Sequence, residues 1–148
     1  MKLVLNEFII DRAAGGPDQQ LSILQLVQAI DTKNHVVVLT SNLISRYYNK
    51  IKKYEKSMQK LPKAIKAFIS LIQDSTKVFW VGQLSDFDLP ETLEDDRDII
   101  AAAVSCESTK LLVTTDGDLI EFLKEKSIAT EYNIEVVKPQ KALEMLTR

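Results

Sequence analysis

Two groups of acidic residues in the C-terminal half of the sequence have the residue types that bind metal ions. Leu111 to Thr115 is a nearly continuous apolar run, and Asp116 and Asp118 follow at its carboxyl end. Asp96 belongs to a second group, residues 94–98, that precedes a run of small apolar residues. Oxygen ligands suit Mg²⁺ and Mn²⁺, and open positions on such an ion leave room for a phosphate. The sequence therefore predicts an oxygen-ligated metal site with Asp96, Asp116 and Asp118 as its candidate ligands.

A structural role explains the same acids without a metal. Asp116 or Asp118 can cap the helix expected after this strand. The acids of residues 94–98 suit a helix N-terminus, where the positive end of the helix dipole lies, and we adopt this interpretation for Asp95 and Asp98. For the acids after the strand, both interpretations stay open.

Alternating strand and helix patterns place these acids at one edge of a predicted sheet. Each predicted strand is nearly continuously apolar, as is typical of strands covered on both faces. The five predicted strands are Lys2 to Leu5, His35 to Leu39, Lys77 to Val81, Leu111 to Thr115 and Ile134 to Val137. We therefore expect an α/β fold, a three-layer sandwich with a central parallel sheet of about five strands. Functional groups should lie at the carboxyl ends of these strands.

Helical patterns fill the segments between the predicted strands. Apolar residues recur at helical spacing from Leu21 to Ile30, after a turn at Gly15, Gly16 and Pro17. The stretch from Ser41 to Gln73 is predicted to contain two helices that separate near Pro62, because proline fits the first turn of a helix but not its interior. We expect one helix after the first strand, two after the second, one after the third, one after the fourth and a short helix after the fifth.

The composition excludes several other functions. A chain of 148 residues is expected to form one domain, residues 1–148. Cys106 and His35 are the only cysteine and histidine, so disulfides, histidine-based triads and cysteine- or histidine-rich metal sites lack their groups. Four glycines form no phosphate-binding loop. No apolar run reaches membrane-spanning length and the N-terminus lacks a signal-peptide pattern, so no membrane association and a cytoplasmic location are expected.

The stretch from Asp96 to Leu119 resembles the PIN-domain family, which includes ribonuclease toxins of toxin–antitoxin pairs and relatives of flap endonucleases. In that family an Asp begins a helix of small residues, and the next strand ends in Leu-Val-Thr-x-Asp-x-Asp-Leu, as residues 112–119 do here. Residues 134–140 are similar to the family's closing strand and proline turn. As an order of elements, the resemblance covers most of the chain.

The resemblance implies a hydrolase that cleaves RNA with the help of Mg²⁺ or Mn²⁺. It carries over to Asp96 and Asp116 as catalytic residues and metal ligands, to Asp118 as a further ligand, and to Thr114 as a polar neighbour. An ion held there activates water for attack on the phosphodiester and steadies the developing charge. RNA, a protein antitoxin and a second copy of the chain are the partners that the resemblance implies.

Two positions depart from the family's pattern. Asn6 stands where the first strand normally ends in Asp, and Arg46 stands where a Glu is expected on the helix after the second strand. Glu7 is a candidate replacement ligand, and Arg46 could instead pair with Asp96 or Asp116 in the cation's place. The resemblance therefore implies one of two functions, a PIN-like metal-dependent endoribonuclease or a weakened or inactive PIN-like module that binds RNA or a protein. With two acids replaced, weak metal binding and slow or absent RNA cleavage are expected.

A basic segment supplies the candidate nucleic-acid surface. From Arg46 to Lys66 there are eight basic residues and a single acid, Glu55, although the chain as a whole has a net charge of −2. The lysines proposed to contact RNA recur at three- or four-residue steps: Lys52, Lys56, Lys60 and Lys63. The alternative is an ordinary solvated helix surface. Tyr47, Tyr48 and Tyr54 lie among these cations, where they either stack on bases or belong to the core.

Overall fold

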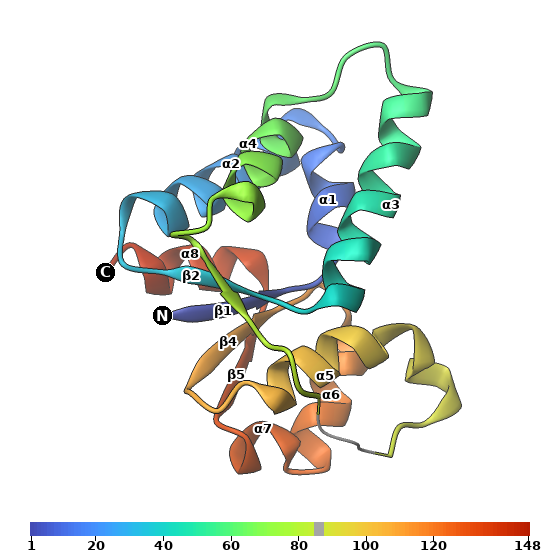
Figure 1. The fold of residues 1–148 in the computed structure, drawn as a ribbon, viewed down its shortest axis with the longest axis vertical. Coiled ribbons are helices and arrows are strands. Elements are labelled where there is room, and N and C mark those ends of the chain that lie inside the picture. The colour runs from blue at the N-terminus through green and yellow to red at the C-terminus, as the bar shows by residue number, and fades with distance from the viewer. Residues whose placement is uncertain (85–87) are drawn as a thin grey trace.

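The computed structural model describes residues 1–84 and 88–148, and the strands of this part form one five-stranded parallel sheet (Figure 1). The strands are β1 (Lys2–Leu5), β2 (Val36–Leu39), β3 (Val78–Trp80), β4 (Lys110–Val113) and β5 (Ile134–Val137). They lie in the order β3-β2-β1-β4-β5, so β1 and β4 are neighbours at the centre and β3 is an edge strand. This architecture confirms the expected α/β fold with a central parallel sheet.

Helices cover both faces of the sheet. The helices are α1 (Phe8–Ala13), α2 (Pro17–Thr32), α3 (Ser41–Ser57), α4 (Lys63–Gln73), α5 (Arg97–Ser105), α6 (Gly117–Glu125), α7 (Ile128–Glu131) and α8 (Pro139–Leu146). A 3₁₀ segment, η1 (Glu91–Asp96), leads directly into α5. Helices α1, α2, α4 and α8 gather on one side of the sheet, and α5, α6 and α7 lie on the other (Figure 1). Helix α3 contacts both α1 and α5, so it connects the two layers at the carboxyl end of the sheet.

The first crossover differs from the sequence prediction. One helix was expected between the first two strands, and the structure has two, α1 and α2. Helix α1 has six residues, fewer than two turns, which is too short for the helical period to be visible in the sequence. The predicted separation of two helices near Pro62 is confirmed, because α3 ends at Ser57 and α4 begins at Lys63.

Helix α3 is fixed over the end of β1 by a buried tyrosine. Tyr47 is fully buried, and its hydroxyl donates a hydrogen bond to the carbonyl oxygen of Leu5. Its ring packs edge-on against Phe68 of α4, with the ring centroids 5.2 Å apart. Of its two predicted roles, Tyr47 therefore has the core one. This contact sets the position of α3, and with it the position of Arg46.

Candidate functional site

The carboxyl ends of β1 and β4 bring two buried polar side chains together. The pairing aligns Leu5 with Val113, so Asn6 and Thr114 leave the sheet side by side. The Asn6 amide donates to the Thr114 hydroxyl at 2.9 Å, and the Asn6 side-chain oxygen accepts the backbone N–H of Phe8 at 3.1 Å. Both side chains are almost completely buried. Asn6 is thus held rigidly at the base of the predicted site.

Asp116 is oriented from both sides of its own turn. Its backbone N–H donates to the Thr114 hydroxyl at 3.1 Å. Its carboxylate Oδ1 accepts the backbone N–H groups of Asp118 at 3.0 Å and Leu119 at 3.3 Å, so it caps α6. The capping role foreseen for this acid is therefore real. It uses one carboxylate oxygen and leaves the other for a second partner.

That second partner is Asp96. The Asp116 carboxylate lies near enough to Asp96 to raise the pKa of Asp96, both by its charge and by a side-chain hydrogen bond, so the two acids are neighbours at the carboxyl edge of the sheet. Asp96 stands at the junction of η1 and α5, is only 9% exposed, and makes no side-chain capping bond to α5. Helix capping therefore does not explain Asp96.

The environment of Asp96 favours its protonated form. Burial raises the pKa of Asp96 to about 6, and the negative charges of Asp116, Asp95 and Glu7 add to the increase. Asp116 is half-buried and its charge lies beside Asp96, so ionisation of Asp96 costs stability unless a cation offsets the repulsion. The salt bridges of the described residues involve neither Asp96 nor Asp116.

Arg46 neutralises a different pair of acids. Its Nη1 atom donates to Glu7 at 3.1 Å, and its Nε atom donates to Asp98. Arg46 therefore does not take the cation's place between Asp96 and Asp116, and the interpretation that it pairs with them is wrong. The carboxylate of Glu7, the candidate replacement ligand, forms a salt bridge with Arg46 instead. Asp98, assigned to the helix N-terminus only, is also an ion-pair partner.

The capping of α3 explains why Arg46 reaches this position. Thr40, the buried residue after β2, accepts the backbone N–H of Leu43 at 3.1 Å, so α3 begins directly at the carboxyl edge of the sheet. A cavity of about 10 Å³, room for roughly one water molecule, has both Arg46 and Asp96 in its lining. It is lined by Asn6, Glu7, Leu43, Arg46, Asp95, Asp96 and Ile99.

Asp96 and Asp116 are the two neighbouring carboxylates that this edge of the sheet offers to a divalent ion. Within residues 1–84 and 88–148, no group of three or more His, Cys, Asp or Glu side chains is arranged to hold a metal. Asp118 is exposed in the first turn of α6 and borders a separate hollow with Thr92 and Glu121. Water would have to fill the remaining coordination positions of an ion at Asp96 and Asp116.

The predicted basic stripe is exposed but does not follow one helix. Lys52 and Lys56 lie on α3, Lys60 lies in the connection to α4, and Lys63 begins α4. The nearby Lys50 turns inward and pairs with Asp11 at 2.7 Å, and the Tyr54 hydroxyl donates to the same carboxylate. The cations available to a ligand are therefore those on the outer side of α3 and in the loop after it.

Sequence reasoning did not identify the ion pairs that surround the site. Glu7, Arg46 and Asp98 come from separate elements, and no local spacing in the sequence connects them. It also did not identify Lys110, a buried lysine at the start of β4 whose ammonium group donates to the carbonyl oxygen of Cys106. Burial lowers the pKa of Lys110.

Comparison of the chain with models of known protein families, with curated proteins and with solved structures finds no match. Among the described residues, no helix has both the length and the apolar character needed to cross a membrane. The geometry of the site is therefore the basis for a functional proposal.

The raised pKa of Asp96 predicts an unusual pH dependence of stability. Because the folded state binds this proton more tightly than the unfolded state does, the free energy of unfolding should fall as pH rises from about 4 to 6. Asp96→Asn removes the charge, so at pH 7.5 it should raise the free energy of unfolding by about 1–3 kcal/mol. Below pH 4 this gain should disappear. Urea unfolding at both pH values measures it.

The control is Asp95→Asn, which removes the same charge from an exposed neighbour. It should change the free energy of unfolding by less than about 0.5 kcal/mol. Destabilisation of the Asp96→Asn variant at pH 7.5 would show that the charged form of Asp96 has a favourable partner.

Proposed function

We propose that this chain is a PIN-like, Mg²⁺- or Mn²⁺-dependent endoribonuclease of low activity. The observation that carries the proposal is that the buried carboxyl group of Asp96 lies beside the half-buried carboxylate of Asp116 at the carboxyl edge of the sheet. A like-charged buried pair costs stability, and a divalent cation relieves that cost. This pair is the part of the family's acidic site that the sequence retains.

The negative charge around the pair supports dependence on a metal ion. Glu7, Asp95 and Asp116 all contribute negative charge near Asp96, and Arg46 is the cation paired with Glu7. An RNA phosphate that approached these acids alone would be repelled. An ion bound by Asp96 and Asp116 supplies the opposite charge and a water molecule of lowered pKa. The role of the chain's own residues is to hold that ion.

The same structure explains why the activity should be low. Asn6 offers a neutral amide, and this amide is already bonded to Thr114. Arg46 adds a positive charge next to the site and occupies the carboxylate of Glu7. The ion therefore has two anionic ligands and a nearby repulsive charge, which lowers its affinity.

The exposed lysines of α3 and the following loop support RNA as the substrate. The basic segment is a concentrated positive surface on a chain of net negative charge, and all of its lysines except Lys50 are exposed. Such a surface binds phosphates without reading sequence. The proposal extends to a biological role: the chain acts in the cytoplasm as the toxin of a toxin–antitoxin pair. Its partner is then a protein antitoxin.

A second candidate is a PIN-like module that binds RNA or a protein without cleaving. The ion pairs of Arg46 favour this second candidate, because they occupy the carboxylates of Glu7 and Asp98, which are then not available as metal ligands. The two candidates differ in whether Asp96 and Asp116 take part in RNA cleavage.

Metal-dependent cleavage tests the proposal directly. Purified protein with Mn²⁺ should cleave single-stranded RNA slowly, and chelation of the metal should stop the reaction. Asp116→Asn should lower the rate about 100-fold, because it removes an anionic ligand. Asn caps a helix as well as Asp does, so this variant should keep α6 intact and serve as the control for a contaminating nuclease. The endoribonuclease proposal is contradicted if cleavage persists in the Asp116→Asn variant or if no metal concentration produces cleavage. Either result would favour the second candidate, a module that binds without cleaving.

Asn6→Asp should increase metal affinity. The new carboxylate can accept a hydrogen bond from the Thr114 hydroxyl, so the change fits the existing contact. We expect Mn²⁺ to bind about tenfold more tightly, a gain of roughly 1.4 kcal/mol, and RNA cleavage to increase. Calorimetric titration with Mn²⁺ measures the affinity.

Asn42→Asp is the matched control, because it adds the same charge at an exposed position on α3 and should leave Mn²⁺ binding unchanged. Adding Arg46→Glu to Asn6→Asp is the fuller restoration of the family's acids. It also deprives Glu7 and Asp98 of their cation, so the single change is the cleaner test. Equal affinities of the two single variants would separate Asn6 from the metal site.

The lysine surface should control RNA affinity and its salt dependence. Changing Lys52, Lys56 and Lys60 to Glu should weaken RNA binding strongly and flatten the slope of affinity against salt, because fewer counterions are released. Fluorescence anisotropy at several salt concentrations measures both quantities. The control changes Lys124, Lys126 and Lys141, which are also exposed, to Glu. If both triple variants lose affinity equally, the surface on α3 has no special role.

A further inference from the structure

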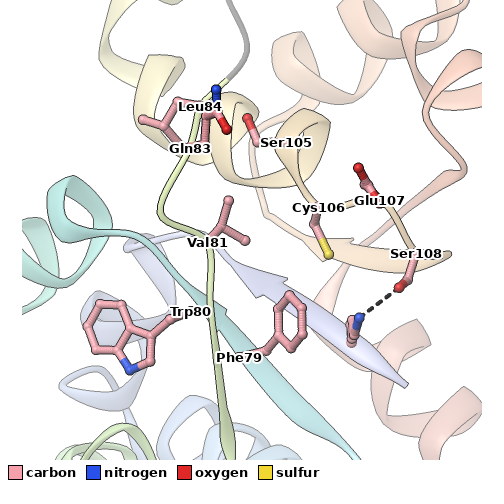
Figure 2. A pocket seen from close by; sticks show the side chains of 10 residues that line it. Phe79, Trp80, Val81, Gln83, Leu84, Ser105, Cys106, Glu107 and Ser108 are labelled. Atoms are coloured by element: carbon pink, nitrogen blue, oxygen red, sulfur yellow. Dashed lines mark hydrogen bonds between the residues drawn. The ribbon is translucent and has the colours of Figure 1, made fainter.

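A hollow of about 660 Å³ lies at the carboxyl end of α5, away from the acids at the other end of that helix. It opens between the edge strand β3 and the segment that joins α5 to β4 (Figure 2). Its lining includes Lys2, Gln83, Ser105, Glu107 and Ser108. This volume is within the usual range for small-molecule sites. None of the residues proposed to hold a metal or to contact RNA lines the hollow.

A lysine without an acidic partner belongs to this lining. The ammonium group of Lys2 donates to the Ser108 hydroxyl at 2.7 Å and lies 3.7 Å from the centroid of the Phe79 ring. The salt bridges of the described residues include neither Lys2 nor Glu107, the acid of the lining. In Figure 2 the Glu107 side chain points away from the bond to Ser108. Within the described part of the chain, no carboxylate therefore pairs with Lys2.

A second ammonium group lies behind the wall of the hollow. Lys110 is opposite Lys2 in the pairing of β1 with β4 and is only 1% exposed. Its ammonium group donates to the carbonyl oxygen of Cys106, a residue of the lining, and forms no salt bridge in residues 1–84 and 88–148. Burial lowers the pKa of Lys110, and the charge of Lys2 lowers it further. Buried charges are ordinarily paired, so these two lysines lack an anion.

The segment after α5 adds hydrogen-bond donors to the lining. The Ser108 hydroxyl accepts from Lys2, so its own hydrogen can be donated to a ligand. The backbone N–H groups of Glu107 and Ser108 have no acceptor among the described residues. The side-chain amide of Gln83 supplies a further donor from the other wall. A lysine together with hydroxyl and backbone donors is a typical set for phosphate oxygens.

We propose that this hollow binds the phosphate group of a small molecule. A phosphate monoester carries about two negative charges at neutral pH, so it can offset both Lys2 and Lys110. Its oxygens can accept from Ser108 and from the backbone of the same segment. The volume leaves room for the rest of a phosphorylated compound beside the half-exposed ring of Phe79. The site goes beyond the proposed RNA cleavage and does not depend on it.

Inorganic phosphate and glycerol phosphate are the probes for this site. In calorimetric titrations of the whole chain at constant ionic strength, both should bind in a saturable way. Lys2→Gln removes one charge at a half-exposed position and should weaken the binding of both probes at least tenfold. Ser108→Ala, also at a half-exposed position, should weaken it severalfold. No saturable binding of either probe would overturn the proposal, and so would binding of inorganic phosphate alone, because it excludes a phosphate ester.

Lys124→Gln is the matched control for lost charge. Lys124 is exposed on α6 and does not line the hollow, so both probes should bind this variant as they bind the unaltered protein. The variant with Lys52, Lys56 and Lys60 changed to Glu should also keep its affinity. Equal weakening by Lys2→Gln and Lys124→Gln, or weakening only by the changes on α3 and its loop, would assign phosphate binding to general positive charge and overturn the proposal. Acetate that competes as well as phosphate would likewise contradict a phosphate site.

Discussion

Parallel pairing of β1 with β4 at the centre of the sheet fixes the polar groups of the site. Because Leu5 is opposite Val113, the next residues, Asn6 and Thr114, leave the sheet in contact. Thr114 then orients the backbone of Asp116, whose carboxylate caps α6 and meets Asp96. A shift of one residue in this register would turn the apolar side chains of both strands to the wrong faces. The hydrophobic core therefore enforces the arrangement of the acids.

The acids near this edge fall into two groups with different energetic roles. Glu7 and Asp98 are paired with Arg46, and such pairs at a partly exposed site contribute little to stability. Asp96 and Asp116 face each other, and this contact costs stability when both are charged. Capping explains Asp116 but not Asp96, which makes no capping bond. A buried acid that lowers stability without a structural role is the feature typical of a functional site.

The sequence predicted the parts of this arrangement that depend on local pattern. Continuous apolar runs identified the strands, and the alternation of strands with helices along the chain predicted that Asp116 and the start of α5 share one edge of the sheet, where Asp96 and Asp116 are neighbours. The partners of Arg46 could not be predicted, because a long side chain can reach several acids and its bond to Asp98 spans 52 positions. The burial of Lys110 could not be predicted from the sequence either, because its partner is a backbone carbonyl at the end of α5, which no residue type reveals.

Helix α5 fixes the position of Asp96 at the edge of the sheet. Its buried residues, including Ala102 and Ala103, are small, so the helix packs closely on the sheet. Asp96 stands at its first end and Cys106 at its last, ten residue steps or about 15 Å apart along the axis. One inserted residue would rotate one end by about 100° relative to the other and turn either Asp96 or Cys106 away from the sheet. The close packing of one short helix therefore keeps Asp96 beside Asp116.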